Sequence, residues 1–346
     1  HLSIRRQRQM CIRDSADIVE FLTHPAVILA SIIGLDLLLG DPVYSWHPVR
    51  LIGNLISWFE TKLRSIGLDG KFGGIILVLL LLFCAFVVCT GISHFLTRIH
   101  WSLSWLWSVY LGWSFLALRD LLVHAKHVVD AMETENLSEA KRQVGMLVGR
   151  DTKLMDLPAC GRATVESVSE NLNDGVMAPL LFFCFFGIPG MLLFKVVSTL
   201  DSMVGYQNKL YQDFGWCSAK FDDLLSWIPA RISWLFLSGT AALFPEFSGS
   251  NAFKVGWKDH AKLPSSNAGW CEATAAGALK IRLCGPIWRE GKLAHNYWLG
   301  RQKDREGATA RDIQLVSRLA LATTLIVSGI LGYLLWLSEF KPFFCP

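Results

Sequence analysis

Three carboxylates at four-residue intervals form the most distinctive chemical pattern in the chain. Glu166, Glu170 and Asp174 follow Arg162 at this spacing, within the stretch ESVSENLNDGVMAPL. On a helix, side chains four residues apart share one face, so the acids form a like-charge stack that destabilises an isolated helix. Mg²⁺ relieves such repulsion and is typically held by one or two carboxylates together with substrate phosphates. The spacing predicts a magnesium site; a solvated polar face is the alternative, and the apolar segment that follows favours the site.

A second group of acids lies in residues 198–232, STLDSMVGYQNKLYQDFGWCSAKFDDLLSWIPARI. It contains Asp201, Asp213 and the adjacent pair Asp222 and Asp223, whose side chains point to different faces of a helix. Ionisable side chains at a membrane edge are costly and are functional candidates for that reason. The group is therefore a second candidate site, and a set of ordinary caps and salt bridges is the alternative.

Two motifs rich in proline or glycine add candidate anion ligands. In GDPVYSWHPVR the prolines favour an extended turn, and Arg50 carries the planar fork that grips a phosphate. In SSNAGWCEATAAGALK, Asn267 opens a helix whose free N–H groups suit an anion. Glu272 lies in the first turn of that helix, where the helix dipole alone explains an acid. The sequence has no P-loop, no dinucleotide-binding glycine fingerprint and no HExxH.

The composition is that of an integral membrane protein. Hydrophobic residues make up 52% of the 346 residues and charged residues 18%, against about 25% charged in a soluble domain. Segments 18–39, 72–96, 101–118 and 315–337 are apolar enough to span a bilayer. The small net charge of +4 is spread along the chain and predicts no nucleic-acid partner. We expect an all-α polytopic integral membrane protein with about four to five spanning helices.

The chain ends and the cysteines carry less information. The first fifteen residues, HLSIRRQRQMCIRDS, differ from the rest and are expected to be non-native, with a genuine basic tail as the alternative. Residues 16–346 are then expected to form a single membrane-embedded domain. Nine cysteines at irregular spacings, without a CxxC pair, predict reduced structural thiols.

The apolar segment 176–197 is interrupted at Gly-Ile-Pro-Gly, residues 187–190. Each half has about ten residues, or roughly 15 Å of helix, which is half the hydrocarbon thickness of a bilayer. We therefore expect a re-entrant helical hairpin, with a proline-kinked spanning helix as the alternative. The turn of such a hairpin must be shielded by protein, because lipid cannot satisfy its free backbone groups.

Lysine and arginine indicate which connecting segments face the cytoplasm. They concentrate in the polar helical stretch 119–175 and again in the polar segment 246–312. The positive-inside rule places both on the cytoplasmic side, the first as a helical insert. The apolar segment 227–244 does not fit this scheme if it spans, so its topology stays open.

Taken in order, the motifs resemble those of the adenosylcobinamide-phosphate synthases, a membrane family of cobalamin biosynthesis. The matching stretches are DLLLGDP, HPVRLIG, VGRDT, ESVSENLNDGVMAPL, GIPG, STLDSMVGYQN, YQDFGW, FDDLLSWIPAR and SNAGWCEATAAGALKIRLCGP. No single motif is decisive, but nine in family order are specific. The chain departs from the family pattern at Ser266 and Cys271, where proline is usual. It also has IWREGKL after the last Gly-Pro, where the family usually has Tyr-Gly-Gly.

The resemblance implies an ATP-dependent amide ligation. The free carboxyl of adenosylcobyric acid would be joined to the amine of (R)-1-aminopropan-2-yl phosphate, or of ethanolamine phosphate, to give adenosylcobinamide phosphate. ATP and Mg²⁺ would be the cofactors. The protein would be a multi-pass protein of the cell inner membrane with its site facing the cytoplasm, and other membrane proteins of cobamide assembly would be further partners.

The resemblance also implies roles for residues that match the family motifs. Glu166, Glu170 and Asp174 would hold Mg²⁺–ATP, helped by Asn171 as a further cofactor-binding residue. Glu166 counts among the catalytic residues as well. Arg50 and Arg150 would neutralise phosphates. Asp201, Asp222 or Asp223 would take a proton from the attacking ammonium as general base, and Asn267 would position a carbonyl or a phosphate.

Two other functions fit parts of the sequence. A secondary transporter has broken helices and intramembrane acids, but it also predicts inverted repeats and acids at mid-helix. A non-catalytic membrane sensor of the same superfamily, of the type linked to β-lactamase regulation, predicts that several acidic motifs are lost. Here all of these motifs are present, which favours the ligase.

Overall fold

The computed structural model describes residues 17–41, 44–206, 208–289 and 292–338. The segment 1–15 and Pro42 lie outside these ranges. The α-helices are α2 (Pro25–Leu39), α3 (Pro48–Ser65), α4 (Lys71–Ile99), α5 (Trp101–Ser114), α6 (Leu118–Glu133), α7 (Leu137–Val144), α8 (Leu157–Leu172), α9 (Ala178–Val204), α10 (Trp216–Leu225), α11 (Trp227–Leu243), α12 (Gly249–Asp259), α13 (Ala268–Leu279) and α14 (Ala310–Leu337). A π-helical turn (Asn173–Met177) joins α8 to α9, and a 3₁₀ turn (His260–Lys262) follows α12.

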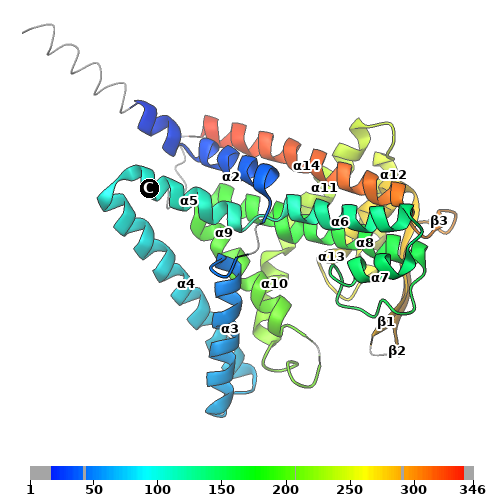
Figure 1. The fold of residues 1–346 in the computed structure, drawn as a ribbon, viewed down its shortest axis with the longest axis horizontal. Helices are drawn as coiled ribbons and strands as arrows, with labels where there is room; N and C mark the ends of the chain where they lie inside the picture. The colour runs from blue at the N-terminus through cyan, green and yellow to red at the C-terminus, as the bar shows by residue number, and fades with distance from the viewer. Residues whose placement is uncertain (1–16, 42–43, 207, 290–291, 339–346) are drawn as a thin grey trace, which may run out of the picture.

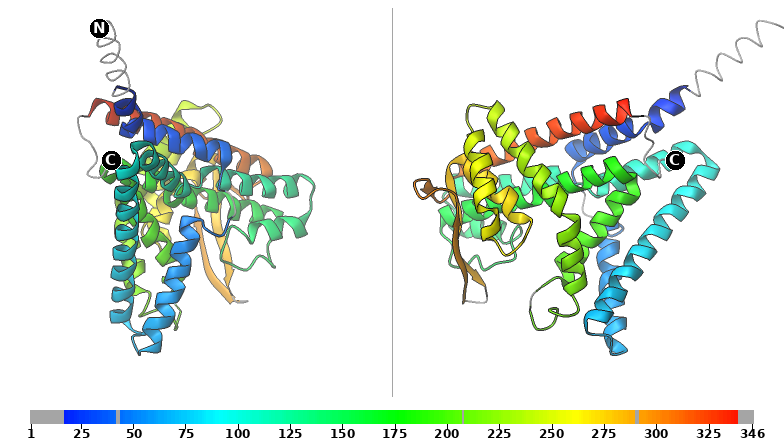
Figure 2. Two further views of the ribbon diagram at one scale, coloured as in Figure 1. Left: turned by 60° about the vertical axis from the view of Figure 1, so that its left-hand side comes forward. Right: turned by 180° about the vertical axis from the view of Figure 1, so that it is seen from behind.

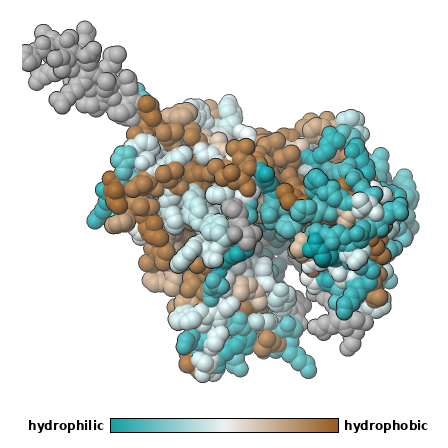
Figure 3. Space-filling model, in the orientation of Figure 1, coloured by the Kyte–Doolittle hydropathy of each residue, from teal (hydrophilic) through white to brown (hydrophobic). Residues whose placement is uncertain are grey.

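The helices form one bundle with an apolar end and a polar end. Helix α14 contacts α2, α6 and α8, while α4 leaves the bundle at an angle and contacts α3, α5 and α9 (Figures 1 and 2). Figure 3 shows apolar residues over the half that holds α5 and the adjoining part of α4, and polar residues over the half that holds α6 and α7. Exposed side chains such as Phe83, Phe95 and Leu334 make up part of the apolar surface.

Four helical stretches are long and apolar enough to cross a membrane: Lys71–Ile99, Trp101–Glu133, Leu157–Val204 and Ala310–Leu337. A fifth is the bent pair Asp17–Thr23 and Pro25–Leu39, which meet at 57°. These spans confirm the all-α polytopic class and the expected four to five crossings. Helix α11, in the segment of open topology, has 17 residues and is not among them.

Helix α9 is broken at the Gly-Ile-Pro-Gly stretch, and the chain folds back on itself there. Gly187 has φ 66° and ψ −155°, a backbone region that is essentially restricted to glycine. The rings of Phe182 and Phe194 stack at 5.2 Å between centroids, whereas twelve residues of straight helix would separate them by roughly 18 Å. A Cβ on Gly190 would lie 2.5 Å from the carbonyl oxygen of Phe182. Both glycines are thus needed, and the two halves form the expected helical hairpin.

A small sheet lies within the segment 246–312 and was not expected from the sequence. Strand β1 (Ile281–Arg289) pairs antiparallel with β2 (Lys292–Leu299) and parallel with the short β3 (Arg305–Glu306), in the order β2-β1-β3. Strand β1 contacts α8 and α13. The sheet therefore covers the helix that carries the acidic ladder.

Candidate active site

The acidic ladder begins with a buried ion pair. Arg150, in the loop between α7 and α8, places its Nη2 at 2.5 Å from Oε2 of Glu166, and the two side chains are 12% and 8% exposed. The backbone N–H of Cys284, on β1, donates to the other carboxylate oxygen at 2.7 Å. Burial alone would lower the pKa of Arg150, but the paired carboxylate of Glu166 raises it above its ordinary value. Arg150 therefore keeps a fixed positive charge at this position.

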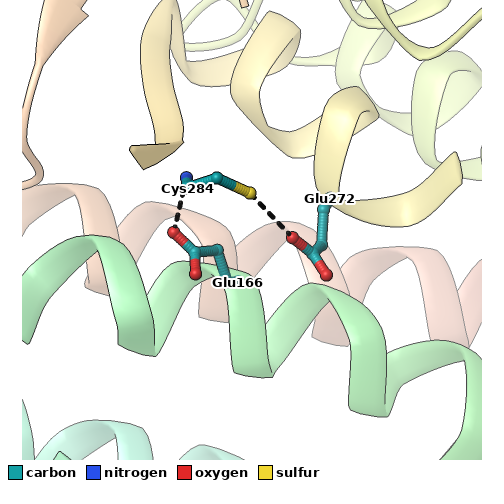
Figure 4. Close-up of side chains that lie close together, drawn as sticks. All are labelled: Glu166, Glu272 and Cys284. Carbon is teal, nitrogen blue, oxygen red and sulfur yellow. Dashed lines mark hydrogen bonds between the residues drawn. The ribbon is translucent and has the colours of Figure 1, made fainter. Parts of the chain in front are cut away.

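Glu166, Glu272 and Cys284 form a compact buried cluster (Figure 4). One potential ligand atom from each lies within 4.8 Å of the others, and the Cys284 thiol donates to Glu272 at 3.6 Å. Burial, reinforced by Glu170 and Glu166, raises the pKa of Glu272 well above its usual range. Burial, followed by the carboxylates of Glu166 and Glu272, also raises the pKa of the Cys284 thiol. The raised pKa values favour the protonated forms of Glu272 and Cys284, and Arg150 pairs with the charge of Glu166.

A cavity of about 480 Å³, here called the Arg150 cavity, opens beside this cluster. Arg150, Glu166, Glu170 and Glu272 line it from α8, α13 and the α7–α8 loop. Ser265 and Ala268 contribute the start of α13, and the sheet closes another side. Glu170 is exposed within it. The cavity thus combines one fixed cation with a helix N-terminus, both of which favour an anionic ligand.

A second cavity of about 410 Å³, here called the Lys195 cavity, lies on the other side of the ladder. Its walls come from α3, α6, the α8–α9 junction and the returning half of α9. The polar residues that line it are Asp120, His124, Asn171, Asp174, Lys195, Ser198, Thr199 and Ser202. The ladder is therefore divided: Glu166 and Glu170 face the Arg150 cavity, and Asp174 faces the Lys195 cavity.

The acids predicted from separate motifs lie close enough to affect one another's pKa electrostatically. Burial, followed by the negative charges of Asp174, Asp201, Asp223 and Glu170, raises the pKa of Asp222 to about 8. This brings together acids from α8, the π-helical turn, α9 and α10. In the part of the chain that the structure describes, no Lys, Arg or His nitrogen lies within 4.0 Å of the carboxylates of Glu170, Asp174, Asp201 or Asp222.

Asp223 and Asn267 connect α10 with the start of α13. Ser266 donates to the Asp223 carboxylate at 3.0 Å, and the Asn267 amide donates to the Asp223 carbonyl at 2.9 Å. The Asn267 oxygen accepts from Arg231 at 2.8 Å. Both ends of the buried Asn267 amide are therefore engaged. Through these hydrogen bonds, Asn267 holds α10 and the start of α13 together at the rim of the Arg150 cavity.

Arg50, Asp213 and Asn171 are the candidates least integrated into this arrangement. Arg50 is exposed in the first turn of α3, with no ion-pair or hydrogen-bond partner in the described ranges. Asp213 is also exposed, 3.9 Å from Lys71. Asn171 is exposed and donates to the Ser167 carbonyl at 2.8 Å. Of the three, Asn171 lines a cavity beside the ladder.

Lys195 is the residue that the motif analysis missed. It stands alone as a cation in the apolar helix α9, and hydroxyl residues follow it at positions i+3, i+4 and i+7. This spacing places one polar stripe on an otherwise apolar helix. An intramembrane cation with such a stripe is a signal that could have identified the second cavity.

Comparison with known proteins shows the family to which the chain belongs. A family model described as CobD/Cbib protein matches residues 28–320. The chain belongs to the CobD/Cbib protein family. It is 40% identical over 278 residues to "Cobalamin biosynthesis protein CobD" of Photorhabdus laumondii, covering 80% of this chain and 87% of the relative. It is 42% identical over 260 residues to the CobD protein of Geobacter metallireducens, with 75% and 81% covered.

The Salmonella typhimurium relative, "Cobalamin biosynthesis protein CbiB", is 36% identical over 296 residues, which cover 83% of this chain and 92% of the relative. No solved structure matches the chain. Membership in the CobD/Cbib family confirms the resemblance stated from the motifs and supports a biosynthetic role in the cobalamin pathway. A multi-pass membrane location agrees with the spans described above.

Proposed function

We propose that this CobD/Cbib family member is an ATP-dependent amide ligase that converts adenosylcobyric acid to adenosylcobinamide phosphate. The observation that carries the proposal is the convergence of acids from α8, the π-helical turn, α9 and α10. Two of these acids, Glu170 and Asp174, line cavities that hold an arginine and a lysine. Family membership supports a corrinoid as one substrate. Phosphoryl transfer needs such a concentration of metal-binding acids and phosphate-neutralising cations.

The reaction has two steps. The corrinoid carboxylate attacks the γ-phosphorus of ATP, which forms an acyl phosphate and releases ADP. The free amine of (R)-1-aminopropan-2-yl phosphate, or of ethanolamine phosphate, then attacks the acyl carbon, and inorganic phosphate leaves. Overall, the carboxylate, the ammonium and ATP⁴⁻ give the amide, ADP³⁻, HPO₄²⁻ and one proton.

The acids without ion-pair partners fit a magnesium site. Glu170 and Asp174 offer the hard oxygen ligands that Mg²⁺ requires, and their mutual repulsion calls for a cation. Mg²⁺ bound there would neutralise charge on the ATP phosphates. Glu166 remains part of the proposed site, but its contact with Arg150 at 2.5 Å gives it the role of orienting the arginine, in addition to the ligand role expected from the ladder.

Proton transfer and phosphate binding can be assigned to neighbouring residues. Asp222, whose pKa is raised to about 8 by burial and nearby acids, suits a general base that accepts the ammonium proton near neutral pH. Asp201, one of the acids that act on it, is the alternative base. Arg150 would bind phosphate in its cavity. Arg50 would bind phosphate near the Lys195 cavity, because it follows Val49, which lines that cavity. Asn267, at the rim of the Arg150 cavity, would position a carbonyl or a phosphate.

The test is an activity assay on detergent-solubilised protein. Adenosylcobyric acid, aminopropanol phosphate, ATP and Mg²⁺ are supplied, the amide product is followed by mass spectrometry, and ADP and AMP are quantified. Product with stoichiometric ADP is expected, whereas AMP would indicate an adenylate in place of the acyl phosphate. If folded protein gives no product with either amino-alcohol phosphate, the ligase proposal is wrong and the sensor or transporter function is favoured.

A further inference from the structure

The Lys195 cavity has a wall that can hold an anion. Lys195, Ser198, Thr199 and Ser202 lie on one face of the returning half of α9, and all four line the cavity. The Lys195 ammonium has no carboxylate within 4.0 Å and donates no hydrogen bond to another described residue. A half-buried cation in an apolar helix is costly, so it is expected to have a partner. Within the described chain no side chain pairs with it directly, which points to a ligand.

The hydroxyl groups beside Lys195 can support the same ligand. Thr199 donates to the Lys195 carbonyl at 2.6 Å, and Ser202 donates to the Ser198 carbonyl at 2.9 Å. A hydroxyl hydrogen rotates freely to suit its partner. Each of these groups can therefore turn from the helix backbone to an oxygen anion in the cavity.

Other elements that line the cavity contribute carboxylates. Asp174 accepts a hydrogen bond from the Asn173 amide at 2.7 Å, and Asp120 lies 3.5 Å from the His124 ring nitrogen. The charges of Asp41 and Asp174 both act on Lys195. The cavity lining thus combines a cation and hydroxyls from α9 with carboxylates from α6 and the π-helical turn. Such a lining is complementary to a small molecule that bears both a phosphate and an ammonium group.

We propose that the Lys195 cavity binds the amino-alcohol phosphate substrate. This inference rests on the proposed ligase function and assigns one of its substrates to a place. Lys195, with Thr199 and Ser202, holds the phosphate, and Asp174, which has a second carboxylate oxygen when the first binds Mg²⁺, faces the ammonium. A volume of about 410 Å³ lies at the small end of the range for ligand pockets, which suits this small substrate.

The position of Asp174 also explains how the two substrates meet. It follows Glu170 by one helical turn, and Glu170 lines the Arg150 cavity. The amine is therefore held at the border between the cavities. An activated carboxyl group in the Arg150 cavity lies on the other side of that border, where the amide bond forms.

The test compares two amines in the ligase assay. For Lys195→Met, kcat/KM with aminopropanol phosphate should fall about 30- to 100-fold, the loss typical of a charged hydrogen-bond donor. Its kcat/KM with unphosphorylated aminopropanol, and its KM for ATP, should stay within about three-fold of wild type. Thr199→Val should show a smaller loss of the same selectivity. Lys209→Met, at an exposed lysine after α9, is the matched control and should behave as wild type.

The outcomes separate the inference from the proposed function. If the wild-type protein forms no amide, the ligase proposal fails. If it does, but Lys195→Met keeps the full preference for the phosphorylated amine, only the cavity assignment is wrong. The assay uses lipid-free detergent micelles, because phosphatidylethanolamine carries the same phosphate and ammonium groups. If Lys195-dependent effects appear only when that lipid is added, the cavity recognises a lipid headgroup and the substrate assignment is wrong.

Discussion

Replacing Glu166 by glutamine changes one charge at the centre of the candidate site and almost nothing in shape. In the structure, one carboxylate oxygen accepts from Arg150 at 2.5 Å and the other accepts from the Cys284 backbone at 2.7 Å. The glutamine oxygen can still accept from Cys284. Its NH₂ group must then face the guanidinium, which has only donors of its own. Glu166→Gln therefore leaves Arg150 as an uncompensated and largely buried cation.

The expected cost follows from this burial. Removing one partner of a buried ion pair typically costs about 3–5 kcal/mol. Because Arg150 and Glu166 border a cavity of about 480 Å³ that admits water, we expect the lower end, about 3 kcal/mol. At about 2 °C per kcal/mol for a large chain, Tm should fall by about 6 °C. Turnover should fall about 100-fold, as for loss of one preorganised charge contact.

The assay is thermal unfolding in detergent at a fixed scan rate, followed by tryptophan fluorescence, with turnover measured in parallel. A fixed rate is needed because such midpoints are often kinetic. Glu139→Gln is the matched control, since Glu139 forms an exposed pair with Arg142 and such pairs contribute little. Combining Glu166→Gln with Arg150→Met should recover most of the lost Tm without recovering turnover.

Two results would refute this reasoning. If Glu166→Gln lowers Tm no more than Glu139→Gln does, the pair with Arg150 does not stabilise the fold. If its turnover stays within a few-fold of wild type, Glu166 is not part of the active site, and the metal-ladder hypothesis is wrong for this residue.

Three further predictions concern the acids and the hairpin. Burial and neighbouring acids raise the pKa of Asp222 from 3.8 to about 8. Between about pH 4 and pH 8, the folded protein therefore keeps a proton on Asp222 that the unfolded chain has lost. Without Mg²⁺, Tm should fall as pH rises from about 4 to 8, and Asp222→Asn should flatten that fall; an unchanged slope would mean that Asp222 is ionised. At pH 7.5, Mg²⁺ at about 100 times its Kd should raise wild-type Tm by about 5 °C but not that of Asp174→Asn; an equal rise would place the metal elsewhere. Gly187→Ala should cost about 1–3 kcal/mol because its φ of 66° disfavours a side chain, whereas Gly329→Ala, with open space around an added Cβ, should be neutral or slightly stabilising; equal Tm values would contradict the break at Gly187.

The membrane part of the fold could be predicted because its signals are local. A run of apolar residues long enough to cross a bilayer is visible in the sequence, and Gly187 and Gly190 mark the hairpin by residue type alone. The strands Ile281–Arg289 and Lys292–Leu299 carry no comparable signal. Their residues mix charged, aromatic and small side chains, and the sheet is stabilised by contact with α8 and α13. Such tertiary packing is not encoded in local spacing.

The candidate site could be predicted in part for the same reason. Spacing of four residues identified Glu166, Glu170 and Asp174 as one face of a helix. Glu166 and Glu170 do line the same cavity, whereas Asp174, in the π-helical turn, lines the other. Spacing could not show that a loop returns Arg150 to Glu166, or that Cys284 reaches it from a strand 118 residues later. These contacts depend on the packing of the sheet and the loop. They change the environment of Glu166 from an open acid to a buried, paired one.

The hairpin gives a physical reason for placing the acids next to a short apolar segment. Twenty-one residues separate Asp174 from Lys195, and a continuous helix of that length would hold them roughly 30 Å apart. Because the chain reverses at Gly187, both residues line one cavity. A broken helix thus brings an acid and a base from opposite ends of an apolar segment to the lining of one cavity. The apolar rings at the turn, among them Phe182 and Phe194, stabilise the reversal. The segment that is too short to span the bilayer therefore positions the two opposite charges, Asp174 and Lys195, in the lining of one cavity.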